Sequence, residues 1–114
     1  MSKIFFKNYY LDLFNTQSEK VKDKIDYVLF LLTVADRIPK KFFEQITGYD
    51  GLYEVRIEFE SNIFRIFCCF DEGNLVVLFN GFQKKTLKTP KKEIEKAMRI
   101  REEYLENKKK GSKK

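Results

Sequence analysis

Apolar and polar residues alternate most clearly in the middle of the chain. From Tyr53 to Phe59, apolar residues alternate with charged ones, the period-two pattern of a strand with one buried face and one face in water. Two largely apolar runs follow, Ile63–Phe70 and Leu75–Phe79, each after a short polar connection typical of a tight turn. The pattern predicts three antiparallel strands joined as a meander.

The residues before the meander predict a strand and then helices. Lys3–Tyr10 is rich in aromatic residues and predicts a first strand, which turns into a short helix through Leu11–Phe14. Ser18 is placed to cap a longer helix that closes at Asp36-Arg37, because apolar residues recur after it at helical spacing. The residues of this stripe are Val21, Ile25, Val28, Leu29, Leu32 and Ala35.

A second helix is predicted directly after the first. Pro39 suits its first turn, Ile38, Phe42 and Ile46 share one face, and Gly48 ends it. The two helices would form an αα-hairpin. Because a hairpin of this kind covers only one face of a sheet, the other face is expected to be either shielded by another element or exposed to a partner, and an exposed face would be the place to look for function.

A last helix is predicted after the meander. Thr89 is placed as its N-cap and Pro90 as its first residue, and the helix is expected to run to about Asn107. The side chains expected to face inward are Ile94, Ala97, Met98, Tyr104 and Leu105. Residues 1–107 are therefore expected to form a single α+β domain, and residues 108–114 a basic disordered tail.

Charge and composition narrow the function. The 114 residues include 23 lysines and arginines against 17 acidic residues, a net charge of +6 that favours an anionic partner. The chain has no histidine, and Cys68 and Cys69 are neighbours on one predicted strand, so we expect neither a zinc site nor a disulfide between them. We expect no cofactor and no metal. Without a signal peptide or an apolar run long enough for a membrane, the protein is expected to be cytoplasmic.

Arg65 is the exceptional residue of the meander, because it lies within an otherwise apolar strand. An unpaired buried charge costs several kcal/mol, so the guanidinium must have a partner or reach a cleft. One interpretation is an ion pair with Glu54 or Glu58 across the hairpin. The other is that it faces a basic surface and binds an anion, which the three lysines after the last strand favour.

These charged residues can support one chemistry without a metal. Cleavage of RNA by attack of its 2′-hydroxyl needs a base, an acid and groups that stabilise the charge on phosphorus. Arg65, Lys84 and Lys85 are the candidates for stabilising that charge, and Glu54 or Glu58 for the base. A lysine whose pKa is lowered by basic neighbours is an alternative base.

The order of motifs resembles a known family. GLYE-x-R-I, then I-F-R-I-F, then a strand ending in N-G-F-x-K-K-T-x-K-T-P before a helix is similar to the HigB-like branch of the RelE/ParE toxin superfamily. The resemblance covers about residues 3–106. It implies a RelE-like fold, with an N-terminal strand and a helical hairpin packed on a small antiparallel sheet and a C-terminal helix.

The same resemblance implies a function. Toxins of this kind belong to type II toxin–antitoxin modules, and they cut mRNA in the ribosomal A site until a cognate helix-turn-helix antitoxin neutralises them. It implies RNA-binding roles for Arg56, Asn80 and Lys88 besides the catalytic candidates. Many relatives have histidine where this chain has Asn80, so a mechanism based on histidine is excluded. Alternatives are inhibition of DNA gyrase, as in ParE-like relatives, and non-catalytic binding of nucleic acid.

Overall fold

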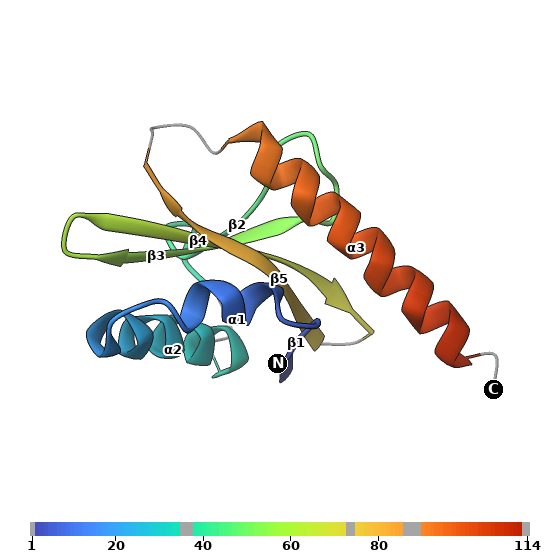
Figure 1. The fold of residues 1–114 in the computed structure, drawn as a ribbon, viewed down its shortest axis with the longest axis horizontal. Helices are drawn as coiled ribbons and strands as arrows, with labels where there is room; N and C mark the ends of the chain where they lie inside the picture. The colour runs from blue at the N-terminus through green and yellow to red at the C-terminus, as the bar shows by residue number, and fades with distance from the viewer. Residues whose placement is uncertain (1, 35–37, 73–74, 86–89, 113–114) are drawn as a thin grey trace.

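The computed structural model describes residues 2–34, 38–72, 75–85 and 90–112, and these form one five-stranded sheet with three helices. In chain order the elements are β1 (Ser2–Phe5), α1 (Tyr9–Phe14), α2 (Glu19–Val34), β2 (Phe43–Gln45), β3 (Tyr53–Phe59), β4 (Asn62–Asp71), β5 (Leu75–Lys84) and α3 (Lys91–Ser112). The strand order is β1-β5-β4-β3-β2 (Figure 1). The predicted α+β fold is confirmed. The sheet is mixed and not purely antiparallel, because β1 runs parallel to β5.

The predicted meander is present as β3, β4 and β5, with antiparallel pairing throughout. On β3, the inward residues Val55 and Ile57 are fully buried, as the alternation predicted. β5 continues beyond the predicted end at Phe79 to Lys84. Its last part stays in the sheet because Gly81 pairs with Ile66 of β4 and the following residues keep that register.

The N-terminal segment turns into a helix earlier than predicted. β1 ends at Phe5, and Tyr9 and Tyr10 belong to α1, so the predicted strand Lys3–Tyr10 is too long. The reason is packing of aromatic rings across the turn. Phe5 stacks on Tyr10 with ring centroids 4.7 Å apart, and Tyr10 is buried against the sheet.

The long predicted helix is confirmed as α2. The hydroxyl oxygen of Ser18 accepts a hydrogen bond from the backbone N–H of Val21 at 3.3 Å, which is the capping role predicted for it. Five residues of the predicted stripe are buried: Val21, Ile25, Val28, Leu29 and Leu32. Ala35 and the predicted end at Asp36-Arg37 lie outside the described residues.

The predicted second helix is wrong. One helical turn does follow Pro39, whose carbonyl accepts hydrogen bonds from the N–H groups of Phe42 and Phe43 at 2.9 and 3.2 Å. The chain then extends as β2 and pairs with β3, where Phe43 stacks on Tyr53 with centroids 5.1 Å apart. Pairing with β3 and this stacking therefore decide the conformation against the helical spacing of the apolar residues.

Both faces of the sheet are covered, so of the two alternatives for the second face the structure shows shielding by another element (Figure 1). α1 and α2 pack on the face that carries Val55 and Ile66. α3 packs on the other face, over Phe67 and Phe79. The apolar stripe of α3 needs such a surface, and it supplies Ile94, Ala97 and Ile100 to the second core.

α3 extends further than predicted. It runs to Ser112, so residues 108–112, which the sequence assigned to a disordered tail, are helical. The physical reason is a contact with the sheet: the Lys108 ammonium lies 2.7 Å from the carboxylate of Asp71, and Tyr104 donates a hydrogen bond of 2.5 Å to the same carboxylate. Leu105 is 39 % exposed and does not face inward as expected. The predicted N-cap, Thr89, lies outside the described residues.

The two cysteines lie on opposite faces of the sheet, as predicted from their positions on one strand. Cys68 belongs to the core under α1 and α2, and Cys69 to the core under α3. Both are free and buried, and burial raises the pKa of each thiol, that of Cys69 to about 11. Their role is packing. In the described ranges, no helix combines the length and apolar character needed to cross a membrane.

Candidate functional site

Arg65 and Glu54 form an ion pair inside the sheet. Arg65 lies on β4 opposite Arg56 of β3, which places Glu54 on the same face, one step along the diagonal. The Nη1 of Arg65 donates a hydrogen bond to Oε1 of Glu54. Arg65 is only 7 % exposed. The predicted ion pair across the hairpin is therefore confirmed, and its partner is Glu54.

This pair is incompletely satisfied. Burial raises the pKa of Glu54 above its ordinary value, and the positive charges of Arg65, Lys84 and Arg56 oppose that rise. Oε2 of Glu54 and Nε of Arg65 are buried, and neither has a hydrogen-bond partner in the described part of the chain. An unpaired buried polar atom costs about 1–3 kcal/mol. Most buried polar groups in folded proteins have a partner, so the two atoms call for an explanation, and a catalytic role is one of those known.

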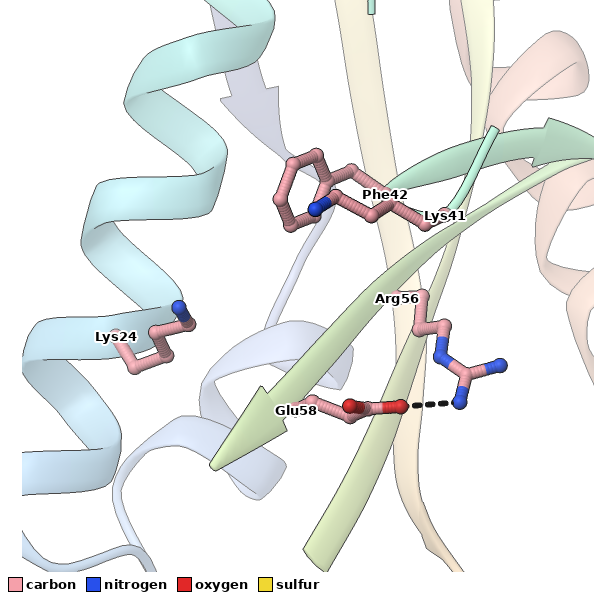
Figure 2. A pocket seen from close by; sticks show the side chains of 5 residues that line it. All are labelled: Lys24, Lys41, Phe42, Arg56 and Glu58. Atoms are coloured by element: carbon pink, nitrogen blue, oxygen red, sulfur yellow. Dashed lines mark hydrogen bonds and ion pairs between the residues drawn. The ribbon is translucent and has the colours of Figure 1, made fainter. Parts of the chain in front are cut away.

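The second carboxylate candidate, Glu58, has a different environment. It is exposed, and its Oε1 accepts a hydrogen bond from Nη2 of Arg56 on the same strand (Figure 2). This hydrogen bond and the charge of Arg56 lower the pKa of Glu58. Of the two candidate bases, Glu54 thus holds a proton more readily than Glu58.

Lys84 completes the cluster. It is the last residue of β5 and is partly exposed. Removal from water lowers its pKa, and the charges of Arg65 and Arg56 lower it further, while Glu54 acts in the opposite direction. Lys84 therefore lies within electrostatic reach of all three residues. Below its pKa, it is a proton donor with a weaker hold on its proton than an ordinary lysine.

The other candidates are distributed differently. Lys85 follows β5 and is exposed, and Lys88 lies outside the described residues. Asn80 is 2 % exposed, and its Nδ2 donates to the backbone carbonyl of Glu93 at 3.3 Å. Asn80 connects β5 to the first turn of α3 beneath the surface, because α3 covers that face, and its role in RNA binding stays a prediction.

Sequence reasoning missed three residues beside this cluster. Lys24, Lys41 and Phe42 line a pocket together with Arg56 and Glu58. Lys41 lies near enough to Glu58 to lower the pKa of that carboxyl. A basic residue next to an aromatic one, Lys41 and Phe42, is a pattern typical of nucleic-acid binding. It was not recognised because the segment was predicted to be a helix, in which these side chains would not face the pocket.

Comparison with known proteins identifies the family. The family model described as phage derived protein Gp49-like (DUF891) matches residues 12–102. The chain belongs to this family. The Gp49-like match spans α2, the whole meander and about the first half of α3, so it includes every candidate residue described above.

A solved structure shows the same fold. The Gp49-like chain is similar to a chain in the crystal structure of the RelB–RelE antitoxin–toxin complex from Methanococcus jannaschii, with a TM-score of 0.53 and 16% sequence identity. The likeness covers 72% of this chain and 91% of that chain. The predicted RelE-like fold is thereby confirmed. No curated protein sequence matches the Gp49-like chain.

Proposed function

We propose that this Gp49-like protein is the toxin of a type II toxin–antitoxin module, of the HigB-like kind, and that it cuts translated mRNA on the ribosome without a metal. The observation that carries the proposal is the cluster of Arg56, Arg65 and Lys84 around Glu54. Three cations and a buried carboxylate provide what cleavage through the 2′-hydroxyl requires.

The chemical step divides among these residues. The 2′-oxygen gives its proton to a base and bonds to phosphorus, and the bond from phosphorus to the 5′-oxygen breaks. The products are a 2′,3′-cyclic phosphate and a 5′-hydroxyl. Arg65 and Lys84 stabilise the negative charge on the phosphorane, with Lys85 and Lys88 holding the message nearby. Lys84, whose pKa is lowered, protonates the departing 5′-oxygen.

Glu54 is the better candidate for the base. Its carboxylate accepts a hydrogen bond from Arg65 in the free protein. A phosphate that binds Arg65 would take over this hydrogen bond, because a guanidinium forks readily onto phosphate oxygens. Glu54 would then lose its counter-charge, its pKa would rise further, and it would accept the proton of the 2′-hydroxyl. Glu58 stays paired with Arg56 at the rim.

The proposed partners follow from this function. The substrate is mRNA in the ribosomal A site, reached in the cytoplasm, and the protein is neutralised by a cognate antitoxin that carries a helix-turn-helix domain. The similarity to a chain of the RelB–RelE complex supports a protein partner, since that structure is of an antitoxin bound to a toxin.

The proposal and its main alternative, inhibition of DNA gyrase, are distinguished by two assays that are carried out in parallel. A bacterial translation extract reports synthesis of a luciferase reporter, and purified DNA gyrase reports supercoiling of a relaxed plasmid. We expect the protein to stop reporter synthesis and to leave supercoiling unchanged. Loss of supercoiling with normal synthesis would instead indicate a ParE-like inhibitor, which the same fold permits.

A further inference from the structure

A basic pocket lies next to the cluster, at the edge of β3. It has a volume of about 510 Å³ and is lined by Lys24, Lys41, Phe42, Arg56 and Glu58. Figure 2 shows where these side chains originate: Lys24 reaches in from α2, Lys41 and Phe42 come from the segment before β2, and the other two come from β3. Residues far apart in the sequence thus contribute to one site.

The pocket adjoins an unpaired part of the strand. β2 pairs with β3 only along Tyr53–Val55, and the N–H of Arg56 donates to the carbonyl of Phe42 at 2.8 Å. On this side of β3, no strand of the described residues pairs with Ile57–Phe59. An open strand edge presents backbone donors and acceptors, and here they border the pocket.

The charge of the pocket is unbalanced. Glu58 is engaged by Arg56. Neither Lys24 nor Lys41 forms an ion pair with a carboxylate among the residues that the structure describes. Among the described residues the pocket therefore keeps an excess of positive charge, which favours an anionic ligand.

An aromatic ring gives the site a second property. Phe42 is half-buried, and the Lys41 ammonium lies 4.9 Å from the centroid of its ring. Aromatic side chains beside lysines are the combination that binds single-stranded nucleic acid: the ring stacks on a base, and the cations contact the adjacent phosphates. Part of the Phe42 side chain packs on the core under α1 and α2, and the remainder is accessible to a base.

The pocket is electrostatically continuous with the cluster around Arg65. Arg56 of the pocket lies directly opposite Arg65 in the pairing of β3 with β4, and the charges of both Arg65 and Lys41 lower the pKa of Glu58. Arg56 belongs to both sites, because it lines the pocket and also lowers the pKa of Lys84. A basic track therefore leads from Lys84 past Arg56 to Lys24.

We propose that this pocket is a nucleotide subsite, which holds a residue of the RNA adjacent to the one that Arg65 and Lys84 contact. Lys24 and Lys41 bind its phosphate, and Phe42 stacks on its base. The inference rests on the proposed function for the identity of the ligand as RNA, but its test measures binding and does not depend on cleavage.

The test uses the full chain and fluorescein-labelled hexauridylate, a single strand that does not pair with itself, followed by fluorescence anisotropy. Lys24→Ala and Lys41→Ala remove the ammonium groups that bind phosphate, and Phe42→Leu removes the ring but keeps an apolar side chain. Lys20→Ala and Lys40→Ala are matched controls, since both lysines are exposed, lie close to the tested ones in sequence and do not line the pocket.

Each lysine variant is expected to weaken binding about 3- to 5-fold at low salt. The slope of log K against log salt should fall by about 0.7 for each phosphate that the variant no longer neutralises. Phe42→Leu is expected to weaken binding about 5-fold or more without changing that slope, because stacking carries no charge. The control variants should change affinity by less than about 2-fold.

Three outcomes would overturn the subsite. The tested lysines could matter no more than their controls, the wild-type protein could fail to bind hexauridylate, or Phe42→Leu could bind like wild type while tripolyphosphate displaces the RNA, which would indicate a site for phosphate alone. The proposed function fails separately. If these variants weaken binding but the protein cuts no message, the proposed subsite is supported and the proposed endonuclease activity is contradicted.

Discussion

Arg65 and Glu54 face one another from neighbouring strands, joined by a hydrogen bond and almost removed from water. Their side chains are 8 % and 12 % exposed. A pair this deeply buried contributes little net stability, because desolvation of the two charges offsets their attraction. In the proposed function, its members are held in position for the phosphate of the substrate.

The first prediction concerns the stability of this pair. Glu54→Ala leaves the Arg65 guanidinium buried without a partner and should lower the free energy of unfolding by about 3–5 kcal/mol. The double variant Arg65→Met/Glu54→Leu replaces both charges with apolar groups and should be about as stable as wild type. Urea denaturation of the single and double variants measures both effects. A Glu54→Ala variant within about 1 kcal/mol of wild type would contradict this account.

The second prediction concerns the pH dependence of Lys84. Its pKa is lowered, so the ammonium loses its charge at lower pH than an ordinary lysine. RNA affinity should therefore decline as pH rises through that lowered pKa. Lys84→Arg keeps its charge at every accessible pH and should retain affinity where the wild type loses it. The affinity of each protein for hexauridylate is measured between pH 7 and pH 10. If the two affinities change with pH in the same way, the prediction that Lys84 contacts the RNA is contradicted.

The third prediction concerns Asp71 and the end of α3. The hydrogen bonds from Lys108 and Tyr104 lower the pKa of Asp71 from 3.8 to about 2. A lowered carboxyl pKa contributes stability above the unfolded value, and that contribution is lost as pH falls through the folded value. Asp71→Asn should therefore be less stable than wild type at pH 6 by about 1–2 kcal/mol.

The sign of this effect can be checked directly. The stability difference between wild type and Asp71→Asn should shrink as pH falls from about 4 to about 2. Urea denaturation at a series of pH values measures it. A difference that is constant over this range would mean that the Asp71 carboxylate does not anchor α3.

The fourth prediction concerns Gly81 on β5. A Cβ added there would lie 2.6 Å from Cδ2 of Leu13 and 3.2 Å from the backbone oxygen of Arg65. Gly81→Ala should thus destabilise the protein by about 1–3 kcal/mol, since α1 and β4 both oppose the added methyl group. A second substitution, Leu13→Ala, would remove the clash with Leu13 but not the one with the backbone oxygen of Arg65. If thermal unfolding shows no loss in Gly81→Ala, close packing of α1 on β5 is contradicted.

Much of the fold followed from the sequence because its signals are local. The alternation in β3, the apolar stripe of α2 and the cap at Ser18 each depend on neighbours in the chain. β2 was missed because it is short and its conformation depends on pairing with β3 and on the stacking of Phe43 with Tyr53. The parallel pairing of β1 with β5 likewise joins strands that are far apart in the sequence, and no local pattern specifies it.

The site was predictable in part for the same reason. Arg65 stood out as a charge in an apolar strand, and hairpin geometry limited its partner to Glu54 or Glu58, of which the structure shows Glu54. The burial of Asn80 could not be predicted from the sequence, because it depends on the position of α3 over the sheet. The contribution of Lys24 to the pocket was also beyond sequence reasoning, since it requires α2 to lie beside the edge of β3.

Mapping of 5′ ends on a message in a translating bacterial extract addresses the proposed chemistry itself. The samples are wild type, Lys84→Ala/Lys85→Ala, the double variant Arg65→Met/Glu54→Leu, which should remain folded, and Lys20→Ala as the control. We predict in-frame cuts that appear only while ribosomes translate, that persist with the control, and that fall about 100-fold or more in the other two variants. A message that stays intact with wild-type protein, or cuts that are unaffected by either substitution at the site, would contradict the account.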